Sequence, residues 1–156
     1  MPKVKPIPDG YHSVSPYLII DNSRASEALD FYARAFGAKE KFRMPRPEGG
    51  ITHAEIQLGD SVIMLADESS KMAAYGPKHY GGSPITLFVY VPDVDATTKQ
   101  AEAAGAKITR PPEDQFYGDR TSGLEDPFGY KWYLATHIRD VSMEELQQHM
   151  SATATA

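Results

Sequence analysis

The segment Ala35-Phe36-Gly37-Ala38-Lys39 occurs a second time in closely similar form, as Ala103-Ala104-Gly105-Ala106-Lys107. Each copy ends a stretch in which apolar residues recur every three or four positions, the period of an amphipathic helix. A glycine just after such a stretch is typical of the left-handed residue that follows a helix. The repeat therefore predicts two equivalent helices, and with them a chain built from two copies of one unit.

Both predicted helices have a cap and an apolar face. Ser23 is the expected cap of the first helix, because a serine hydroxyl can accept a hydrogen bond from the free N–H groups of the first turn. The apolar face of this helix consists of Ala25, Ala28, Leu29, Tyr32 and Phe36. Asp93 is the expected cap of the second helix, whose face consists of Val94, Thr97, Ala101 and Ala104.

Strand-like segments rich in β-branched and aromatic residues surround each helix in the same order. In the first copy they lie at 14–20 before the helix and at 40–44, 51–58 and 61–67 after it. In the second copy they lie at 85–91, 107–110, 120–125 and 130–136. Each unit is thus predicted as β-α-β-β-β, and the fold class as α+β.

The chain is expected to form a single domain over residues 1–140. Its two modules span about 12–67 and 84–137, and residues 68–83 form a linker loop that contains Gly-Pro and Gly-Gly pairs. In the remaining segment, 141–156, Ser142 and Glu145 form a capping box that predicts a helix. The last six residues, 151–156, are expected to be disordered.

Composition excludes several classes of function. The 156 residues carry a net charge of -5 and include no cysteine, which excludes disulfides, thiolate metal sites and cysteine nucleophiles. The basic residues form no stripe, so nucleic acid is not an expected partner. No apolar run approaches the roughly 20 residues that span a bilayer, and no signal peptide is visible. We therefore expect no membrane partner and a cytoplasmic location.

Successive side chains of a strand point to opposite faces of a sheet, so the strand residues divide into two sets. One set is almost wholly apolar and is expected to pack on the helices: Pro16, Leu18, Ile20, Ile63, Leu65, Ile85, Leu87, Val89, Val91, Trp132 and Leu134. The other set is mixed: Ser15, Tyr17, Ile19, Val62, Met64, Ala66, Thr86, Phe88, Tyr90, Lys131, Tyr133, Ala135 and His137. A mixed face suits a ligand trough, and a solvated surface or a dimer interface are the alternatives.

Short motifs accompany the paired pattern: Ala28-Leu-Asp-Phe-Tyr32, Phe36-Gly-Ala38 and Asp126-Pro-Phe-Gly-Tyr130. With them the chain resembles, over roughly residues 12–138, the vicinal-oxygen-chelate superfamily of glyoxalase I, bleomycin-resistance proteins and extradiol dioxygenases. Within it the chain looks closest to the PhnB-like group, on four further motifs: His53-Ala-Glu55, Gly59-Asp-Ser61 with Met64-Leu-Ala-Asp-Glu68, Asp114-Gln-Phe-Tyr-Gly-Asp-Arg120, and Ala135-Thr-His137.

The resemblance implies paired βαβββ modules that form a curved, partly open mixed-sheet barrel, usually in a homodimer. Metalloenzymes of the superfamily take one metal ligand from the first strand and one from the last strand of each module, so the resemblance implies four equivalent positions in this chain. Those four positions align with Tyr17, Met64, Thr86 and Tyr133, none of which is His, Glu or Gln. Since divalent cations of the usual kind need imidazole or carboxylate ligands, we expect no metal at this site and no cofactor.

His53 and Glu55 lie two residues apart on one predicted strand, so they share a face. They could form an acid–base couple, or half of a relocated metal site completed by His137 or Asp119. A hydrogen-bonded pair that lines a wet cavity or an interface is the structural alternative.

The stretch from Asp114 to Arg120 concentrates polar side chains around Gly118. Asp119 and Arg120 are candidate catalytic residues, because the guanidinium group suits a carboxylate or a phosphate. The alternative is an internal Asp119–Arg120 network that braces the loop, or a salt bridge from Arg120 to Glu113 or Glu125, and Phe116 is expected in the core. Candidate ligand contacts are Tyr17, Met64, Thr86, Phe88, Tyr117 and Tyr133.

The leading hypothesis is a PhnB-like protein that binds a small organic molecule in a trough between its modules, with the usual metal site lost. It would either sequester the molecule or act on it without a cofactor. A metal-dependent lyase, isomerase or dioxygenase with relocated ligands is one alternative. A dimeric scaffold without a ligand is the other.

Overall fold

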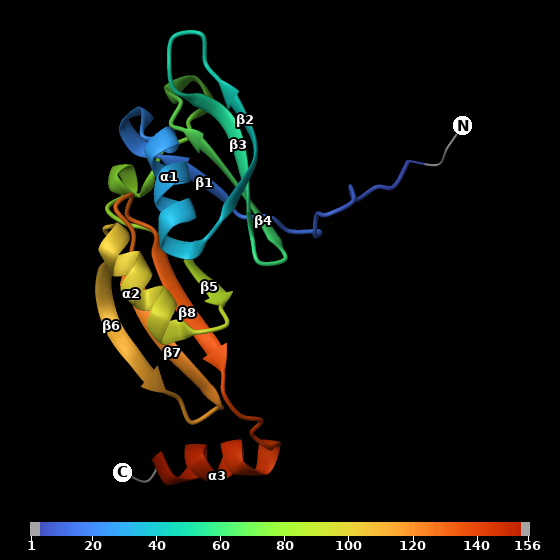
Figure 1. Ribbon diagram of the computed structural model, residues 1–156, viewed down its shortest axis with the longest axis vertical. Helices are drawn as coiled ribbons and strands as arrows, with labels where there is room; N and C mark the ends of the chain where they lie inside the picture. Colours follow the sequence, from blue (N-terminus) through green and yellow to red (C-terminus); the bar gives the residue numbers. More distant parts are fainter. Residues whose placement is uncertain (1–3, 154–156) are drawn as a thin grey trace.

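The computed structural model describes residues 4–153. Figure 1 shows two sheets that follow one another along the long axis of the molecule, with one helix on the same side of each sheet. The first sheet has the strand order β1-β4-β3-β2. Its strands are β1 (Tyr17–Ile20), β2 (Lys39–Pro45), β3 (Ile51–Leu58) and β4 (Ser61–Asp67), and its helix is α1 (Ala25–Phe36).

The second sheet repeats this plan with the order β5-β8-β7-β6. Its elements are β5 (Thr86–Tyr90), α2 (Val94–Ala104), β6 (Lys107–Asp114), β7 (Asp119–Glu125) and β8 (Lys131–His137). In each sheet the first and last strands pair in parallel and the other neighbours pair antiparallel. Two mixed, open sheets with helices on one side confirm the predicted α+β fold class. A third helix, α3 (Met143–Thr153), crosses the far end of the second sheet beside the β6–β7 hairpin (Figure 1).

The predicted helix ends are largely confirmed. Gly37 and Gly105 follow α1 and α2 in the left-handed region, with φ of 68° and 118°, and Asp93 accepts the Ala96 N–H at 2.9 Å. The prediction of Ser23 as the first cap is wrong. The backbone N–H of Ala25 donates instead to the Asp67 carboxylate at 2.8 Å, so the cap comes from the end of β4 rather than from the adjacent chain.

The face of α2 also differs by one residue from the predicted one. Thr98, not Thr97, is buried with Val94 and Ala101, and its hydroxyl lies 2.6 Å from that of Ser122 on β7. A threonine hydroxyl that finds a partner on the sheet can be buried at little cost. Hydropathy alone does not distinguish the two adjacent threonines.

The tail forms the predicted capping box, in which the Glu145 N–H donates to the Ser142 hydroxyl at 3.2 Å. The helix nevertheless runs further than expected, through Thr153, so residues 151–153 are helical rather than disordered. Hydroxyls of Ser151 and Thr153 donate to carbonyls four residues back, which accommodates them in the helix. The rest of the predicted disordered segment, 154–156, lies outside the described residues.

The core lies between the helices and the sheets, and most of the apolar set predicted to face the helices is confirmed there. Leu18, Ile20, Leu65, Trp132 and Leu134 are all buried. Ile85 is an exception, with 67% of its surface exposed, because it precedes β5 at the junction of the two halves.

Asp126 joins the two halves inside this core. Its carboxylate accepts hydrogen bonds from Tyr32 of α1 at 2.7 Å and from the Trp132 indole at 2.9 Å. It also accepts the backbone N–H groups of Phe128 and Tyr130, both at 2.9 Å. Four donors on one buried carboxylate fix the turn before β8 and tie it to α1.

Candidate functional site

Each sheet has one face covered by its helix and one open face. We call these the first open face (β1–β4) and the second open face (β5–β8). Half-exposed aromatic residues from the predicted mixed set lie on them: Tyr17, Phe88, Tyr90 and Tyr133. The mixed set is not uniformly open, however, since Val62 and Ala135 are buried.

A chain of hydrogen bonds crosses the first open face. The Tyr17 hydroxyl lies 2.7 Å from Nδ1 of His53, and Nε2 of the same ring lies 3.1 Å from Oε1 of Glu55. Tyr11, which precedes β1, donates its hydroxyl to the other Glu55 oxygen. His53 and Glu55 are alternate residues of β3, which is why they share this face, as predicted.

The charges along this chain follow from its geometry. The Tyr11 hydrogen bond, together with the one from His53, lowers the pKa of Glu55, so the group is a carboxylate that only accepts hydrogen bonds. His53 therefore donates through Nε2. Burial raises the pKa of Tyr17, whose protonated hydroxyl then donates to Nδ1. Glu55 thus orients the His53 ring from one side and Tyr17 from the other, and a supporting carboxylate of this kind is a usual partner of an acid–base histidine.

A segment before β1, residues 4–16, runs beside the first open face, and Figure 1 shows its start extending away from the body of the molecule. We call it the N-terminal arm. Two contacts besides Tyr11–Glu55 hold it. The Lys41 ammonium lies 4.4 Å from the centre of the Tyr11 ring, and Nε2 of His12 lies 3.0 Å from the Asp60 carbonyl oxygen.

A hollow of about 620 Å³ lies between the arm and the sheet, and we call it the arm hollow. It is lined by Pro6, Ile7, Pro8, Tyr11, His12, Ser13, Ser15, Glu55 and Met64. Two of these, Glu55 and Met64, were predicted as site residues from the sequence. The hollow thus combines apolar walls with one ionised carboxylate, the composition expected of a small-molecule site.

The second open face carries a cluster of similar residue types. Asp119, only 4% exposed, accepts the Tyr90 hydroxyl at 2.8 Å and lies 2.7 Å from Nδ1 of His137. The other ring nitrogen lies 3.0 Å from the Asp140 carboxylate. The hydrogen bonds to Asp119 and then to Asp140 raise the pKa of His137 and favour an imidazolium between two carboxylates.

Arg120 does not join Asp119, because adjacent residues of β7 point to opposite faces. Its guanidinium forms a two-point ion pair with Asp95 of α2, at 2.7 and 3.0 Å, and a further bond to Asp114 at 2.8 Å. The group therefore links α2 to the β6–β7 hairpin. This geometry corresponds to the bracing alternative, although through partners that the sequence did not identify.

The structure divides the six predicted ligand contacts into separate groups. Tyr17 and Met64 are opposite each other in the β1–β4 ladder. In the second sheet Phe88, not Thr86, is opposite Tyr133, and their rings lie 6.4 Å apart. Thr86 is opposite Lys131 near the junction. Tyr17 and Tyr133 therefore each contact residues of their own sheet.

Tyr117 lies in the β6–β7 turn, far from the other predicted contacts along the strand direction. Its ring packs edge-on against Phe116 at 5.4 Å. The prediction that Phe116 lies in the core is wrong. The side chain is 41% exposed, and its ring stacks on His149 of α3 with the ring centres 4.2 Å apart. The hairpin end thus seats the last helix.

Sequence reasoning missed three residues of these clusters: Tyr11, Tyr90 and Asp140. Tyr90 belonged to the mixed set, and its alternation with Phe88 was a usable signal. Tyr11 and Asp140 lie outside the strands, so no periodicity indicated where their side chains would point.

A family model, the Glyoxalase/Bleomycin resistance protein/Dioxygenase superfamily, matches residues 17–134. The chain belongs to this superfamily. The uncharacterized protein Rv0887c of Mycobacterium tuberculosis is 39% identical over 143 residues, which cover 90% of this chain and 83% of that one. The uncharacterized protein At5g48480 of Arabidopsis thaliana is 26% identical over 137 residues, 81% of this chain and 82% of that one.

Solved structures of the superfamily fold agree with this assignment. TioX from Micromonospora sp. ML1 has a TM-score of 0.62 and 26% identity, and the match covers 81% of this chain and 100% of that one. A Bacillus cereus structure described as a putative 3-demethylubiquinone-9 3-methyltransferase, PhnB protein, has a TM-score of 0.61 over 80% of this chain and 99% of that one. At 19% identity, the second match shows a shared fold alone.

The four residues that the resemblance aligns with metal-ligand positions carry side chains that do not suit a metal ion. Tyr17 is hydrogen-bonded to His53, and the Tyr133 ring faces Phe88 and the Arg110 guanidinium, 5.1 Å away. Met64 and Thr86 offer a thioether and a hydroxyl, which are poor ligands for the metals that imidazole and carboxylate hold. Across residues 4–153, no group of three or more His, Asp or Glu side chains is arranged to hold an ion. We therefore derive no chemistry through a metal.

None of the helices between residues 4 and 153 is both long and apolar enough to cross a membrane.

Proposed function

We propose that this superfamily member binds a small organic molecule in the arm hollow, without the usual metal. The observation that carries the proposal is the hydrogen-bonded chain from Tyr17 through His53 to Glu55, which ends in an ionised carboxylate at the wall of a hollow of about 620 Å³. That volume is within the range of small-molecule sites.

The chemistry of the hollow indicates how such a ligand would be held. Glu55 offers lone pairs to a donor group of the ligand, and Met64 and the arm prolines supply apolar contact. Tyr11 occupies one carboxylate oxygen through a hydrogen bond from the arm. A ligand donor can take the place of this hydroxyl, so binding and arm position are coupled.

We also propose that the protein forms a homodimer and that it is located in the cytoplasm. Half-exposed aromatic residues on the second open face, such as Phe88 at 47% and Tyr90 at 63%, support a protein partner for that face. A second copy of the chain is the partner that the superfamily resemblance implies. Sedimentation equilibrium with Tyr90→Asp, compared with the wild type, tests this part separately from ligand binding. The proposal expects the variant to be monomeric, and a monomeric wild type would refute the dimer.

A thermal-shift screen of metabolites and antibiotics tests the binding proposal. A ligand present at 100 times its Kd adds about 2.7 kcal/mol to the free energy of unfolding, which raises Tm by roughly 5–10 °C for a chain of this size. We expect at least one compound to do this for the wild type, and to shift Glu55→Gln by less than half as much.

Glu48→Gln is the matched control, because it makes the same chemical change in the exposed β2–β3 turn. It should respond like the wild type. An equal shift in Glu55→Gln and Glu48→Gln, or no shift by any compound at concentrations that saturate weak sites, contradicts the proposed function.

A further inference from the structure

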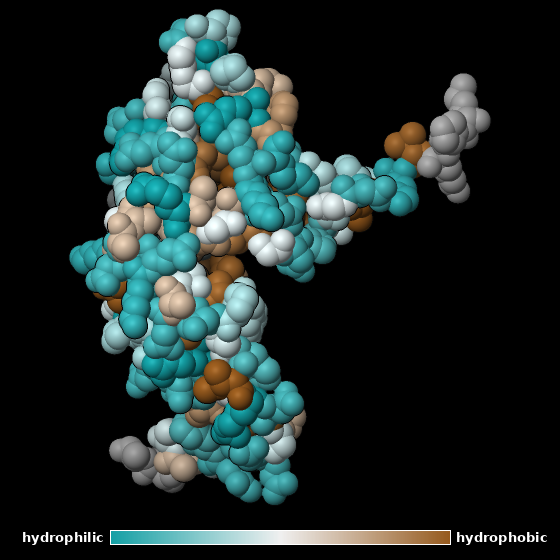
Figure 2. Space-filling model, viewed as in Figure 1, coloured by the Kyte–Doolittle hydropathy of each residue, from teal (hydrophilic) through white to brown (hydrophobic). Residues whose placement is uncertain are grey.

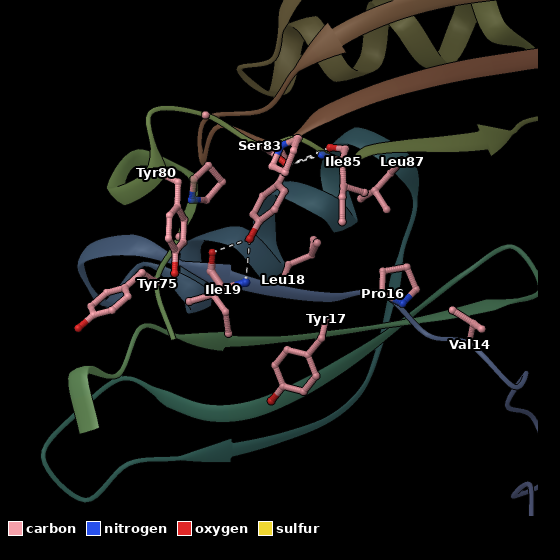
Figure 3. Close-up of a pocket in the computed structure, with 15 residues that line it drawn as sticks. Val14, Pro16, Tyr17, Leu18, Ile19, Tyr75, Tyr80, Ser83, Ile85 and Leu87 are labelled. Atoms are coloured by element: carbon pink, nitrogen blue, oxygen red, sulfur yellow. Dashed lines mark hydrogen bonds between the residues drawn. The ribbon is translucent and has the colours of Figure 1, made fainter. Parts of the chain in front are cut away.

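A second hollow, which shares no lining residue with the arm hollow, lies where the two halves meet. Figure 3 shows this junction pocket between β1, the start of β5 and the linker. Its volume is about 420 Å³. Leu18, 4% exposed, lies at its base, while Tyr80 and Ile85, both about two-thirds exposed at 66% and 67%, lie at its rim. Figure 2 shows hydrophobic surface in this middle region of the molecule.

The lining of the junction pocket carries no charge. The lining consists of aliphatic residues and prolines, two glycines, Ser83 and four tyrosines. An anionic ligand would lose its hydration there without gaining a partner of opposite sign, and the Asp21 carboxylate, which lies against Gly76, would repel it. Charge complementarity therefore favours a neutral occupant over an anionic one.

Two of the lining hydroxyls are already satisfied by the backbone. Tyr130 accepts the Ile19 N–H at 2.9 Å and donates to the Ile19 carbonyl at 2.8 Å. Burial raises its pKa to about 12, so the hydroxyl stays neutral. Ser83 bonds both to the N–H and to the carbonyl of Ile85, at 3.2 and 2.9 Å. Binding in this pocket must therefore rely mainly on apolar and aromatic contact.

Figure 3 places the Tyr80 ring on one side of the hollow and Ile85 and Leu87 on the other, whereas the Tyr17 ring points to the other side of β1. The Tyr130 ring also lines the hollow. Rings that face a hollow of this size suit a flat molecule that can stack on one ring or meet it edge-on. We propose that the junction pocket is a second ligand site, specific for a neutral, largely apolar aromatic molecule. This site is independent of the arm hollow and of the function proposed for it.

Two naphthalene dyes that differ in charge test this inference on the full chain. Prodan is neutral, and anilinonaphthalene sulfonate carries a sulfonate. We expect prodan to bind saturably with a blue-shifted emission, and the sulfonate to bind at least about tenfold more weakly.

Variants assign the dye to the pocket. Ile85→Trp places a large ring at the rim and should weaken prodan binding at least about tenfold. Ile138→Trp makes the same change at an exposed residue after β8, outside the pocket lining, and should leave prodan binding unchanged. Tyr80→Ala removes a rim ring from an exposed position, and it should weaken binding even if Ile85→Trp does not fold.

Each opposite result overturns the inference. Equal affinity for both dyes refutes a neutral-selective pocket, and loss of binding in Ile138→Trp alone places the dye outside the junction pocket. Prodan binding that falls as protein concentration rises would mean that a second copy of the chain covers the pocket.

Discussion

The two open faces carry similar residue types in a different order. On the first, the histidine lies between a tyrosine and a carboxylate, in the sequence Tyr17–His53–Glu55. On the second, the histidine lies between two carboxylates, Asp119 and Asp140. The order matters for His137, because two carboxylates favour a proton on both ring nitrogens, whereas on the first face one ring nitrogen faces a tyrosine hydroxyl instead of a second carboxylate.

The faces also differ in how their clusters end. The first cluster ends at a hollow, under the arm, with an ionised carboxylate at the wall. In the second, Tyr90 and His137 bind the two oxygens of Asp119, just as Tyr11 and His53 bind the two oxygens of Glu55. The partners differ: both partners of Asp119 belong to strands of its own sheet, whereas one partner of Glu55 comes from the N-terminal arm beside the hollow.

The largest expected effect is on the free energy of unfolding. It concerns the buried carboxylates of the two halves, which differ in the number of hydrogen bonds they accept. Asp126 accepts four hydrogen bonds, two of them from side chains, whereas Asp67 accepts two backbone N–H groups. Asp126→Ala should lower the free energy of unfolding by about 3–5 kcal/mol, and Asp67→Ala by about 2 kcal/mol, because fewer buried donors lose their partner. Urea unfolding measures both, and an equal or reversed order would show that the halves do not depend on these networks as described.

The next effect is a pH dependence that belongs to the second face. A raised pKa for His137 means that its contribution to stability is fully present below its ordinary pKa of about 6.5. That contribution is lost as pH rises through the higher pKa of the folded state. Urea unfolding from about pH 6 to about pH 9 should therefore show a decline that His137→Gln removes. Asp140→Asn should move the decline to lower pH, and an unchanged profile in both variants would contradict the imidazolium assignment.

The smallest effect is local to the arm. Tyr11→Phe removes the hydroxyl that holds Glu55, so the pKa of Glu55 should rise toward its ordinary value and residues 5–12 should exchange amide hydrogens faster. Hydrogen exchange followed by mass spectrometry measures the change. Tyr80→Phe, the same deletion on an exposed linker tyrosine, should leave the arm unaffected. Unchanged exchange in Tyr11→Phe would mean that other contacts hold the arm.

Local patterns predicted the strands, the helices and their glycine ends, because these depend on periodicity and on backbone preferences of single residues. The same patterns placed His53 and Glu55 on one face of β3, since alternation along a strand is a local rule. They failed where a partner comes from elsewhere in the chain, as with the Asp67 cap of α1 and the pairing of Arg120 with Asp95.

The sequence by itself determined the repeated βαβββ unit and the side of most strands that meets a helix. Only the tertiary structure decided that the predicted contacts fall into two separate faces, that the arm encloses a hollow over Glu55, and that an uncharged pocket lies between the halves. The physical reason is that hydrogen-bond partners and hollows arise from segments distant in the chain, and their meeting depends on how whole modules pack rather than on any local pattern.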